Sequence, residues 1–596
     1  MNRDTQFDTS SASHASVRRR ITLFALIAIA GASMVLVRGA VPATTSGIIL
    51  LVGADESERV VNWYASANTD QVVQVAPTSE LQDGDFPSGA STYPAVVAAN
   101  PVNGGFNGHA IIADLQEDTA YSYRVGGDGA WSSAYQFQTR KFAGDFDFLF
   151  FGDPQIGASG NVPKDQAGWA DTLQVALDAN PDAELLVSGG DQVETAGVET
   201  QWTAFLAPDE LRSYPWVATI GNHDVGSKAY EQHMWTPNTD RSLSHYTTGA
   251  NRSGGDYWFI YKGVLFIDLN SNAYLTSAQV GVDADEAHIG FITDVVAQHG
   301  AEAKYTVLVY HHSIYSPADH ANDGDAKERR KDFPTAFSNL GVDLVLQGHD
   351  HSYSRSYLIE AGVKQKPSEQ PGATSVFKGP GGVVYVTGNS ASGSKYYAIS
   401  APNLNADPLY GPDPLNPSSH WPNSVQSQEN VRNYVKVSVR NNLLSVENIR
   451  SGTCAAPNAA VELGQERTCG PNLGASPALP VGSLVDKVFI VQEANAQVTR
   501  GGLVRDRRTG TFAQQLKITN NSSTLIAGPV GVWLEGLSAN ATLANASGAG
   551  NYIVIPGTNA GLAAGSSATV TLQFLNPTNA AIDYTPHVQA AAQPTP

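Results

Sequence analysis

Short apolar runs alternate with polar blocks along the middle of the chain. The runs at 146–151 (FDFLFF) and 305–310 (YTVLVY) are rich in β-branched and aromatic residues and almost continuously apolar. Such runs are typical of parallel strands that are buried on both faces. Stretches with apolar residues near helical spacing separate several of them, at 164–179, 284–298 and 327–340. The repeated order of strand and helix predicts an α/β domain.

The pattern differs on either side of this region. Between 47 and 139, apolar and polar residues alternate in short runs such as RVVNWYAS and TAYSYRVG, and Gly, Pro and Asp residues separate the runs. The run SSATVTLQFLNP alternates in the same way near the C-terminus. This alternation predicts β-sandwiches. We therefore expect a β-sandwich, an α/β domain and a second β-sandwich, with the bounds 47–140, 141–450 and 483–588.

The segments outside these domains also have predicted roles. Residues 1–43 contain a run of three arginines followed by the apolar stretch 21–37, which is the pattern of an export signal. The segment is either a signal peptide cleaved after Ala43 or a membrane anchor formed by 21–37. We therefore expect a secreted, periplasmic or cell-surface protein. Residues 451–482 form a disulfide loop and linker, and residues 589–596 form a tail.

The linker holds Cys454 and Cys469, the only two cysteines of the chain. They lack the paired spacing of a zinc site. In an exported protein we expect them to form a disulfide, which would contribute about 3 kcal/mol by restricting the unfolded chain.

The net charge of −20 bears on the class of partner. It arises from 36 basic and 56 acidic residues, and outside the N-terminus no more than three basic residues stand in a row. Nucleic-acid-binding surfaces need clustered Lys and Arg side chains. We therefore expect no nucleic-acid polymer as a partner.

Five polar blocks stand at the points where predicted strands end. Because the carboxyl ends of parallel strands meet at one edge of a sheet, we expect the blocks to converge. Each block alone has a structural alternative, such as a Gly-Asp turn or a helix N-cap. Together they offer carboxylate, amide and imidazole groups, which hold pairs of catalytic metal ions. The blocks are GDPQ (152–155), GDQVE (190–194), GNHD (221–224), HH (311–312) and GHDH (348–351).

The ordered set GDPQ, GGDQVE, GNHD, YHHSIY and GHDHSYSRS resembles the calcineurin-like metallophosphoesterases, in the purple acid phosphatase branch. The resemblance covers about residues 50–450. It implies that the α/β domain is a β-sandwich flanked by helices. The stretch LQEDTAYSYRVGGDGAWSSAYQFQTR resembles the fibronectin type III-like module that precedes the catalytic domain in that branch. The C-terminal region resembles the Ig-like modules of bacterial secreted proteins, and its expected role is attachment to a cell surface or matrix, or spacing.

The resemblance also implies roles for individual residues. Asp191 would bridge two metal ions, and Asp153 and His351 would hold the first ion. The family spacing to Tyr315 selects His311 over its neighbour as a ligand of the second ion. The expected ligands of that ion besides Asp191 are Asn222, His311 and His349.

Two histidines outside the ligand set match outer positions of such sites. His223 and His320 resemble the pair that contacts the phosphate and protonates the leaving oxygen. We therefore expect these two residues to be catalytic.

The sequence departs from the family pattern at two positions. Purple enzymes carry Tyr where this chain has Glu194, and the wider superfamily carries His where this chain has Gln155. Both residues are further candidate ligands. Oxygen donors at these positions favour Mn²⁺, Fe²⁺ or Mg²⁺ over obligate Fe³⁺ at the first site. The expected cofactors are two metal ions drawn from Fe, Mn, Zn and Mg.

These observations predict a secreted binuclear phosphoesterase that hydrolyses small phosphomonoesters with a metal-activated hydroxide. A phosphodiesterase or nucleotidase would use the same ligands. A non-catalytic surface protein with a relic central domain is a further alternative. The complete ligand set argues against it, because a relic would be expected to lose a residue such as Asp191, Asn222 or His349.

Overall fold

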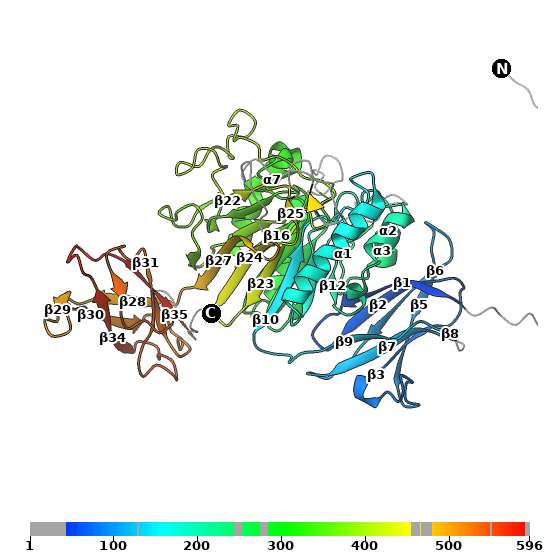
Figure 1. Cartoon of the computed structure of the whole chain (residues 1–596), viewed down its shortest axis with the longest axis horizontal. Coiled ribbons are helices and arrows are strands. Elements are labelled where there is room, and N and C mark those ends of the chain that lie inside the picture. Colours follow the sequence, from blue (N-terminus) through cyan, green and yellow to red (C-terminus); the bar gives the residue numbers. More distant parts are fainter. Residues whose placement is uncertain are drawn as a thin grey trace, which may run out of the picture. The chain divides into compact units, whose positions relative to one another are not determined.

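The structure is a computed structural model (Figure 1), which describes residues 43–127, 130–242, 253–273, 284–454, 465–466, 480–548 and 551–590. Among these residues, no helix is long and apolar enough to span a membrane. The predicted export signal or anchor lies outside the described residues up to residue 42, and Cys469 lies outside them as well. The export signal and the disulfide therefore stay predictions.

The N-terminal part forms a β-sandwich, as its alternating pattern predicts. Trp63, Tyr123 and Phe137 are buried between the two faces. The indole Nε1 of Trp63 donates to Oε1 of Gln71 at 2.7 Å, so its polar group is satisfied inside the core. One face consists of β1 (Thr45–Val52), β2 (Arg59–Ala65), β5 (Val96–Ala99) and β6 (Phe106–Ile112). The other consists of β3 (Val72–Pro77), β4 (Ser91–Pro94), β7 (Ala120–Gly127), β8 (Ala130–Trp131) and β9 (Tyr135–Gln138).

The first face continues into the central domain. β1 pairs in parallel with β12 (Trp216–Val217) through Leu51 and Trp216. The resulting eleven-stranded sheet has the order β20-β27-β24-β23-β10-β11-β12-β1-β2-β6-β5. An exposed edge strand has unpaired backbone groups that can pair with another chain. Pairing with β1 leaves β12 without such an edge.

Two sheets enclose the core of the central domain. The rings of Phe148 and Phe266, one from each sheet, meet edge to face at 5.5 Å. Truncating either ring would cost about 3–5 kcal/mol. The larger sheet contributes β10 (Phe146–Phe151), β11 (Leu185–Ser188), β20 (Ser375–Lys378), β23 (Asn433–Val439), β24 (Leu443–Arg450) and β27 (Leu484–Gln492). The seven-stranded sheet has the order β13-β14-β15-β16-β21-β17-β22. Its strands are β13 (Tyr257–Tyr261), β14 (Val264–Leu269), β15 (Tyr305–Tyr310), β16 (Leu344–Gln347), β17 (Tyr353–Ser356), β21 (Val384–Thr387) and β22 (Asn423–Ser427).

Helices cover the outer faces of both sheets, which explains why the parallel strands are continuously apolar. Trp169 packs on Phe151 of the larger sheet, and Phe333 packs on Tyr310 of the smaller one. All three predicted helices are confirmed, with ends within three residues of the prediction. The helices are α1 (Val162–Ala179), α2 (Glu199–Phe205), α3 (Ala229–His233), α6 (Ala284–His299) and α7 (Gly324–Asn339).

The C-terminal part forms two further sheets around a core of its own. Burial alternates strictly along much of β34, as expected for a strand with one solvent-facing side. β27 belongs to the central sheet, so these sheets begin at β28 and not at residue 483 as predicted. One sheet holds β28 (Ala496–Arg500), β29 (Val504–Arg505), β30 (Phe512–Asn520), β32 (Thr542–Leu543) and β34 (Ser567–Leu575). The other holds β31 (Gly531–Glu535), β33 (Tyr552–Val554) and β35 (Thr585–Gln589).

Candidate metal centre

The predicted ligand blocks lie after the carboxyl ends of strands from both central sheets. Asp153, Asp191 and Asn222 follow β10, β11 and β12, whereas His311 and His349 follow β15 and β16. Packing the two sheets face to face brings these ends together, which a sequence pattern cannot show.

Several residues of these blocks have a left-handed backbone. The φ angles are 36° at Gln155, 47° at Asp191, 73° at His349 and 40° at His351. Each such residue costs about 1–3 kcal/mol and persists where the surrounding structure holds it in place. Strain of this kind gathers at functional sites. Here it turns the side chains at the strand ends toward one another.

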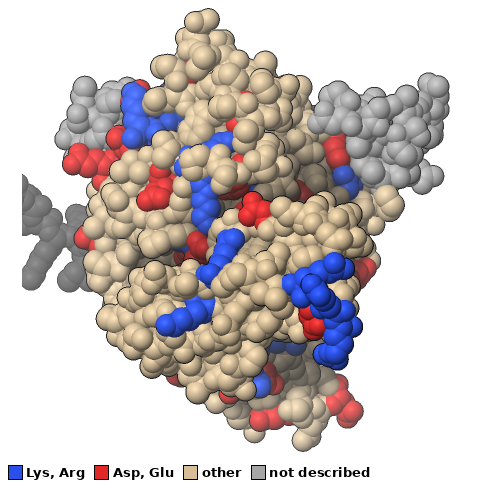
Figure 2. All heavy atoms as spheres, turned by 90° about the vertical axis from the view of Figure 1, so that its left-hand side faces the viewer, with Lys and Arg blue, Asp and Glu red and all other residues tan. Residues whose placement is uncertain are grey.

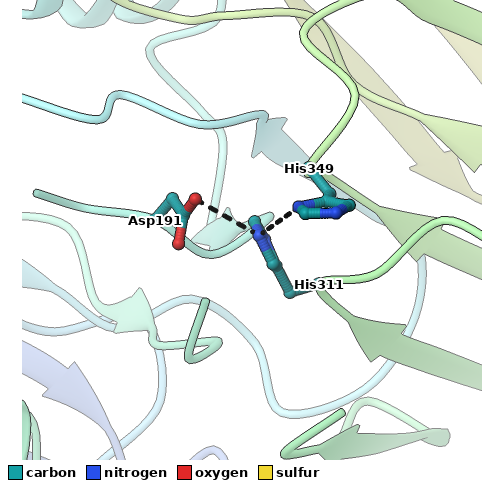
Figure 3. A group of neighbouring side chains, drawn as sticks. All are labelled: Asp191, His311 and His349. Carbon is teal, nitrogen blue, oxygen red and sulfur yellow. Dashed lines mark hydrogen bonds and ion pairs between the residues drawn. The ribbon is translucent and has the colours of Figure 1, made fainter. Parts of the chain in front are cut away.

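Three predicted ligands of the second ion converge on Nε2 of the fourth, His311, and Figure 3 shows two of them, Asp191 and His349. Nε2 of His311 lies 2.9 Å from Oδ1 of Asn222, 3.3 Å from Oδ2 of Asp191 and 3.2 Å from Nδ1 of His349. Nδ1 of His311 faces the carbonyl oxygen of Gly189 at 2.8 Å. If Nδ1 donates there, Nε2 carries a lone pair, which is the usual arrangement of a metal-binding imidazole. Donors packed this closely fit a cation between them.

The charges of this group show the same need for a cation. Burial lowers the pKa of His311, but the carboxylates of Asp191 and Asp153 outweigh it and raise that pKa to about 10. Burial together with the charge of Asp191 raises the pKa of Asp153 to about 7. Two buried carboxylates therefore compete for too little positive charge, and bound metal ions would supply it.

The predicted ligands of the first ion form a second group. Asp153 is fully buried, and its Oδ2 lies 3.3 Å from Nε2 of His351. Both of its carboxylate oxygens also accept the backbone N–H of His349 at 2.9 Å. Nδ1 of His351 lies 3.1 Å from the carbonyl oxygen of Lys395, which orients Nε2 toward Asp153.

Of the two further candidate ligands, Gln155 has a free oxygen to offer a metal ion of this first group, whereas Glu194 contacts Gln155 and His223. Nε2 of Gln155 donates to Oε2 of Glu194 at 2.8 Å. The amide oxygen of Gln155 is buried and has no hydrogen-bond partner among the described residues. A buried oxygen of this kind needs a partner, and a metal ion would provide one. The nearest partners of the Glu194 carboxylate are Gln155 and, at 3.6 Å, Nδ1 of His223.

The two predicted catalytic histidines both adjoin the ligands. The backbone N–H of His223 donates to Oδ1 of Asp191 at 2.9 Å, and Nδ1 of its ring lies 2.7 Å from the carbonyl oxygen of Glu194. The ring of His320 stacks on that of His349 with centroids 3.7 Å apart. With its Nδ1 so engaged, His223 keeps Nε2 for another partner.

Sequence reasoning missed two features of the site. Nδ1 of His320 lies 2.7 Å from Oδ2 of Asp323, so a carboxylate orients this imidazole. A lone Asp in a polar loop carries no signal of that role. The loop that contains Lys395 and Tyr397 also reaches the ligands, and it has no Asp, Glu, His or Cys to reveal it.

The structure also distinguishes the two adjacent histidines. Nδ1 of His312 lies 2.8 Å from Oγ of Ser271, away from the carboxylates, whereas His311 contacts Asp191. His311 therefore stays the predicted ligand of the two.

Residues 45–139 match the family described as "Purple acid Phosphatase, N-terminal domain", and residues 146–353 match the family "Calcineurin-like phosphoesterase". The chain belongs to the calcineurin-like phosphoesterases, in the purple acid phosphatase branch. Enzymes of this family use a dinuclear metal centre. The converging donors and the unpartnered oxygen of Gln155 fit such a centre.

Relatives of this family are distant in sequence. The purple acid phosphatase 22 of Arabidopsis thaliana is 24% identical over 250 residues, which are 41% of this chain and 53% of the relative. An uncharacterised protein of Mycobacterium tuberculosis is 25% identical over 284 residues, 42% of this chain and 50% of its own length. The chain thus spans about half the length of these curated relatives. A purple acid phosphatase from yellow lupin (Lupinus luteus) seeds has the same fold, with a TM-score of 0.53 and 16% identity over 76% of this chain and 75% of that one.

Proposed function

We propose that this chain is a metal-dependent phosphoesterase that hydrolyses small phosphomonoesters. The convergence of Asp191, Asn222 and His349 on Nε2 of His311 carries the proposal. Asp191 is also close enough to Asp153 and His351 for its charge to influence the pKa of both. Family membership supports the class of reaction.

Each group of residues has its own part in this proposal. Asp153, His351 and Gln155 would hold one ion, and Asn222, His311 and His349 would hold the other, with Asp191 between them. When bound, two such ions acidify water to a nucleophile and neutralise phosphate charge. The oxygen-rich surroundings of Gln155 favour Mn²⁺, Fe²⁺ or Mg²⁺ at the first position.

His223 and His320 would transfer the proton to the leaving oxygen. In His320, Asp323 accepts from Nδ1–H, which leaves Nε2 to exchange a proton with the substrate. In His223, the carbonyl oxygen of Glu194 plays the same orienting part. Both imidazoles are thus held in one orientation beside the metal ligands before substrate arrives.

The test combines metal content with substrate preference. The purified protein should contain about two metal ions per chain and should hydrolyse 4-nitrophenyl phosphate faster than bis(4-nitrophenyl) phosphate. Faster hydrolysis of the diester would identify a phosphodiesterase with the same ligands. Bound metal without hydrolysis of either ester would support the non-catalytic alternative.

We further propose that the protein is exported and that its C-terminal sheets attach it to an anionic surface. The export signal at 1–43 supports the first part. Residues 496–590, which form these sheets, hold five basic and three acidic residues, so this part carries none of the net negative charge of the chain. The face drawn in Figure 2 is mostly uncharged, with separate groups of basic side chains and some acidic ones spread over it.

The turn between β28 and β30 has the composition of such an attachment site. Arg505, Arg507 and Arg508 are exposed, and Leu503 and Val504 beside them are 40% and 64% exposed. Arginine attracts anionic head groups, and exposed aliphatic side chains add apolar contact with a bilayer. The protein should therefore sediment with phosphatidylglycerol vesicles but not with phosphatidylcholine vesicles at low salt. Equal sedimentation after replacing the three arginines by Gln would contradict this role of the turn.

A further inference from the structure

The loop that follows β21 lies along the first ligand block. The Oγ of Ser390 donates to the carbonyl oxygen of Asp153 at 3.2 Å, and the Oγ of Ser394 donates to that of Pro154 at 3.3 Å. The hydroxyl of Ser392 also donates to Pro154. Three serine side chains therefore hold this loop on the backbone of a predicted ligand and its neighbour.

The same loop is also tied to the last ligand block. Nδ1 of His351 lies 3.1 Å from the carbonyl oxygen of Lys395. Nε2 of Gln428 lies 2.6 Å from the carbonyl oxygen of His351 and 2.6 Å from that of Tyr397. The backbones of Lys395 and Tyr397 are thus positioned relative to His351 by one direct contact and one shared amide.

Two side chains of the loop reach the site. The ring of Tyr397 lies edge-on to the rings of both His351 and His320, with centroids 5.3 Å apart in each case. It therefore stands between a predicted metal ligand and a predicted acid. The ammonium of Lys395 lies over the ring of Tyr397, 4.6 Å from its centroid, in a cation–π contact.

The ammonium of Lys395 is not committed to an ion pair. In the described part of the chain, no carboxylate lies within 4.0 Å of it. Burial lowers the pKa of Lys395, but the Tyr397 hydroxyl and, to a smaller extent, the carboxylates of Glu194 and Asp191 raise it. Lys395 is also only partly buried. A protonated Lys in this position is free to meet an anion that enters the site.

We propose that Lys395 binds the phosphate group of the substrate and that Tyr397 holds Lys395 in position for this. The proposal rests on the proposed function and deepens it. A monoester phosphate carries about two negative charges near neutral pH, whereas a diester carries one. The attraction to one more cation scales with that charge. Lys395 therefore favours monoesters over diesters.

The test compares Lys395→Met, which keeps the length of the side chain and removes its charge, with Lys395→Arg and with the exposed control Lys331→Met. Binding of inorganic phosphate to the metal-loaded protein is measured by calorimetry, together with metal content and kcat/KM for 4-nitrophenyl phosphate and bis(4-nitrophenyl) phosphate. A charge-assisted hydrogen bond corresponds to roughly a 10–100-fold change in affinity.

For Lys395→Met we expect unchanged metal content, phosphate affinity lowered by roughly 10–100-fold, and a larger fall of kcat/KM for the monoester than for the diester. Lys395→Arg should recover part of the phosphate affinity, and Lys331→Met should match the wild type. Phosphate affinity equal to wild type in Lys395→Met, or equal losses for both esters, would overturn the inference while leaving the proposed function standing. A wild-type protein that binds metal and phosphate but hydrolyses nothing would instead defeat the proposed function.

A second variant tests the part played by Tyr397. Tyr397→Phe keeps the ring that contacts Lys395, so its phosphate affinity should stay within about threefold of wild type. Tyr397→Leu removes the aromatic face and should weaken phosphate binding, as Lys395→Met does. In the double variant, the loss of phosphate affinity should be smaller than the sum of the two single losses. Additive losses would show that the two side chains act independently.

Discussion

Nε2 of His311 lies 2.9 Å from Oδ1 of Asn222, although 89 positions separate the two residues in the chain. His311 follows a strand of the seven-stranded sheet, and Asn222 follows a strand of the eleven-stranded sheet. The contact exists only when the two sheets are packed against each other. Metal ions that bind both residues should therefore stabilise the packing of the sheets.

The first prediction concerns Asp191. Because Asp191 is the expected bridging ligand, Asp191→Ala should remove metal binding and hydrolysis together. The β-sandwiches should stay folded, since their cores lie elsewhere. Elemental analysis and circular dichroism check this, with the exposed Asp182→Ala as the control. Two ions still bound to the Asp191 variant would show that another residue bridges them.

A second prediction separates the acids from the ligands. Replacing His320 or His223 by Ala should lower the rate by roughly 10²–10⁴-fold while metal content is retained. The loss should shrink for 4-nitrophenyl phosphate, whose leaving group needs no proton, relative to an alkyl phosphate. His299→Ala serves as the control. Equal losses for the two substrates would count against proton transfer by the residue replaced.

The carboxylate of Asp323 should act only through His320. Asp323→Asn should lower the rate on alkyl phosphates, because an amide holds the imidazole of His320 in its orientation less firmly than a carboxylate does. In a His320→Ala background, the same change should have almost no further effect. A double-mutant cycle on kcat measures this coupling. Additive losses would mean that Asp323 has a role of its own.

The fourth prediction concerns colour. A phenolate bound to Fe³⁺ gives purple enzymes their visible band, and Glu194 occupies the position of that tyrosine. Iron-loaded, oxidised protein should show no strong visible band, and after chelation Mn²⁺ or another divalent ion should restore activity. Glu194→Tyr is expected to create the band if residue 194 faces the first metal. Tyr397 lies against His351, so a band in the wild type that disappears in Tyr397→Phe would show that this distant tyrosine binds the metal.

Removing the metal should make stability depend on pH in a defined direction. The folded pKa of Asp153 is raised to about 7 from its ordinary 3.8, and that of His311 is raised to about 10 from 6.5. In both cases the folded protein holds the proton more tightly than the unfolded chain does. The stability that these two groups contribute is therefore fully present at low pH. It is lost as the pH rises through about 7 for Asp153 and through about 10 for His311. The pKa of Asp191 is shifted down, so its contribution is lost only as the pH falls below 3.8.

Thermal denaturation across pH 5–9, with and without a chelator, checks this expectation. The metal-free protein should show a Tm that falls with rising pH, and the metal-loaded protein should show a higher Tm with a weaker slope. Parallel curves with and without metal would contradict the placement of the ions at Asp153 and His311.

The sequence by itself determined the local features of this protein. The helices at 164–179, 284–298 and 327–340 were predictable to within three residues, because helical spacing of apolar residues and caps such as Asn161 are local properties. The types and order of the ligand residues are likewise written in short blocks at the ends of strands. These blocks were enough to indicate the family and the class of chemistry.

Only the tertiary structure decided which atoms meet. The packing of two sheets brings Nε2 of His311 to Asn222, turns His312 away to Ser271, and places Asp323 against His320. It also carries the loop with Lys395 to the first ligand block, far from it in sequence. These contacts depend on the relative position of strands and loops that are distant along the chain. A local pattern of residue types contains no information about that position, because every such contact is made across the space between separate elements.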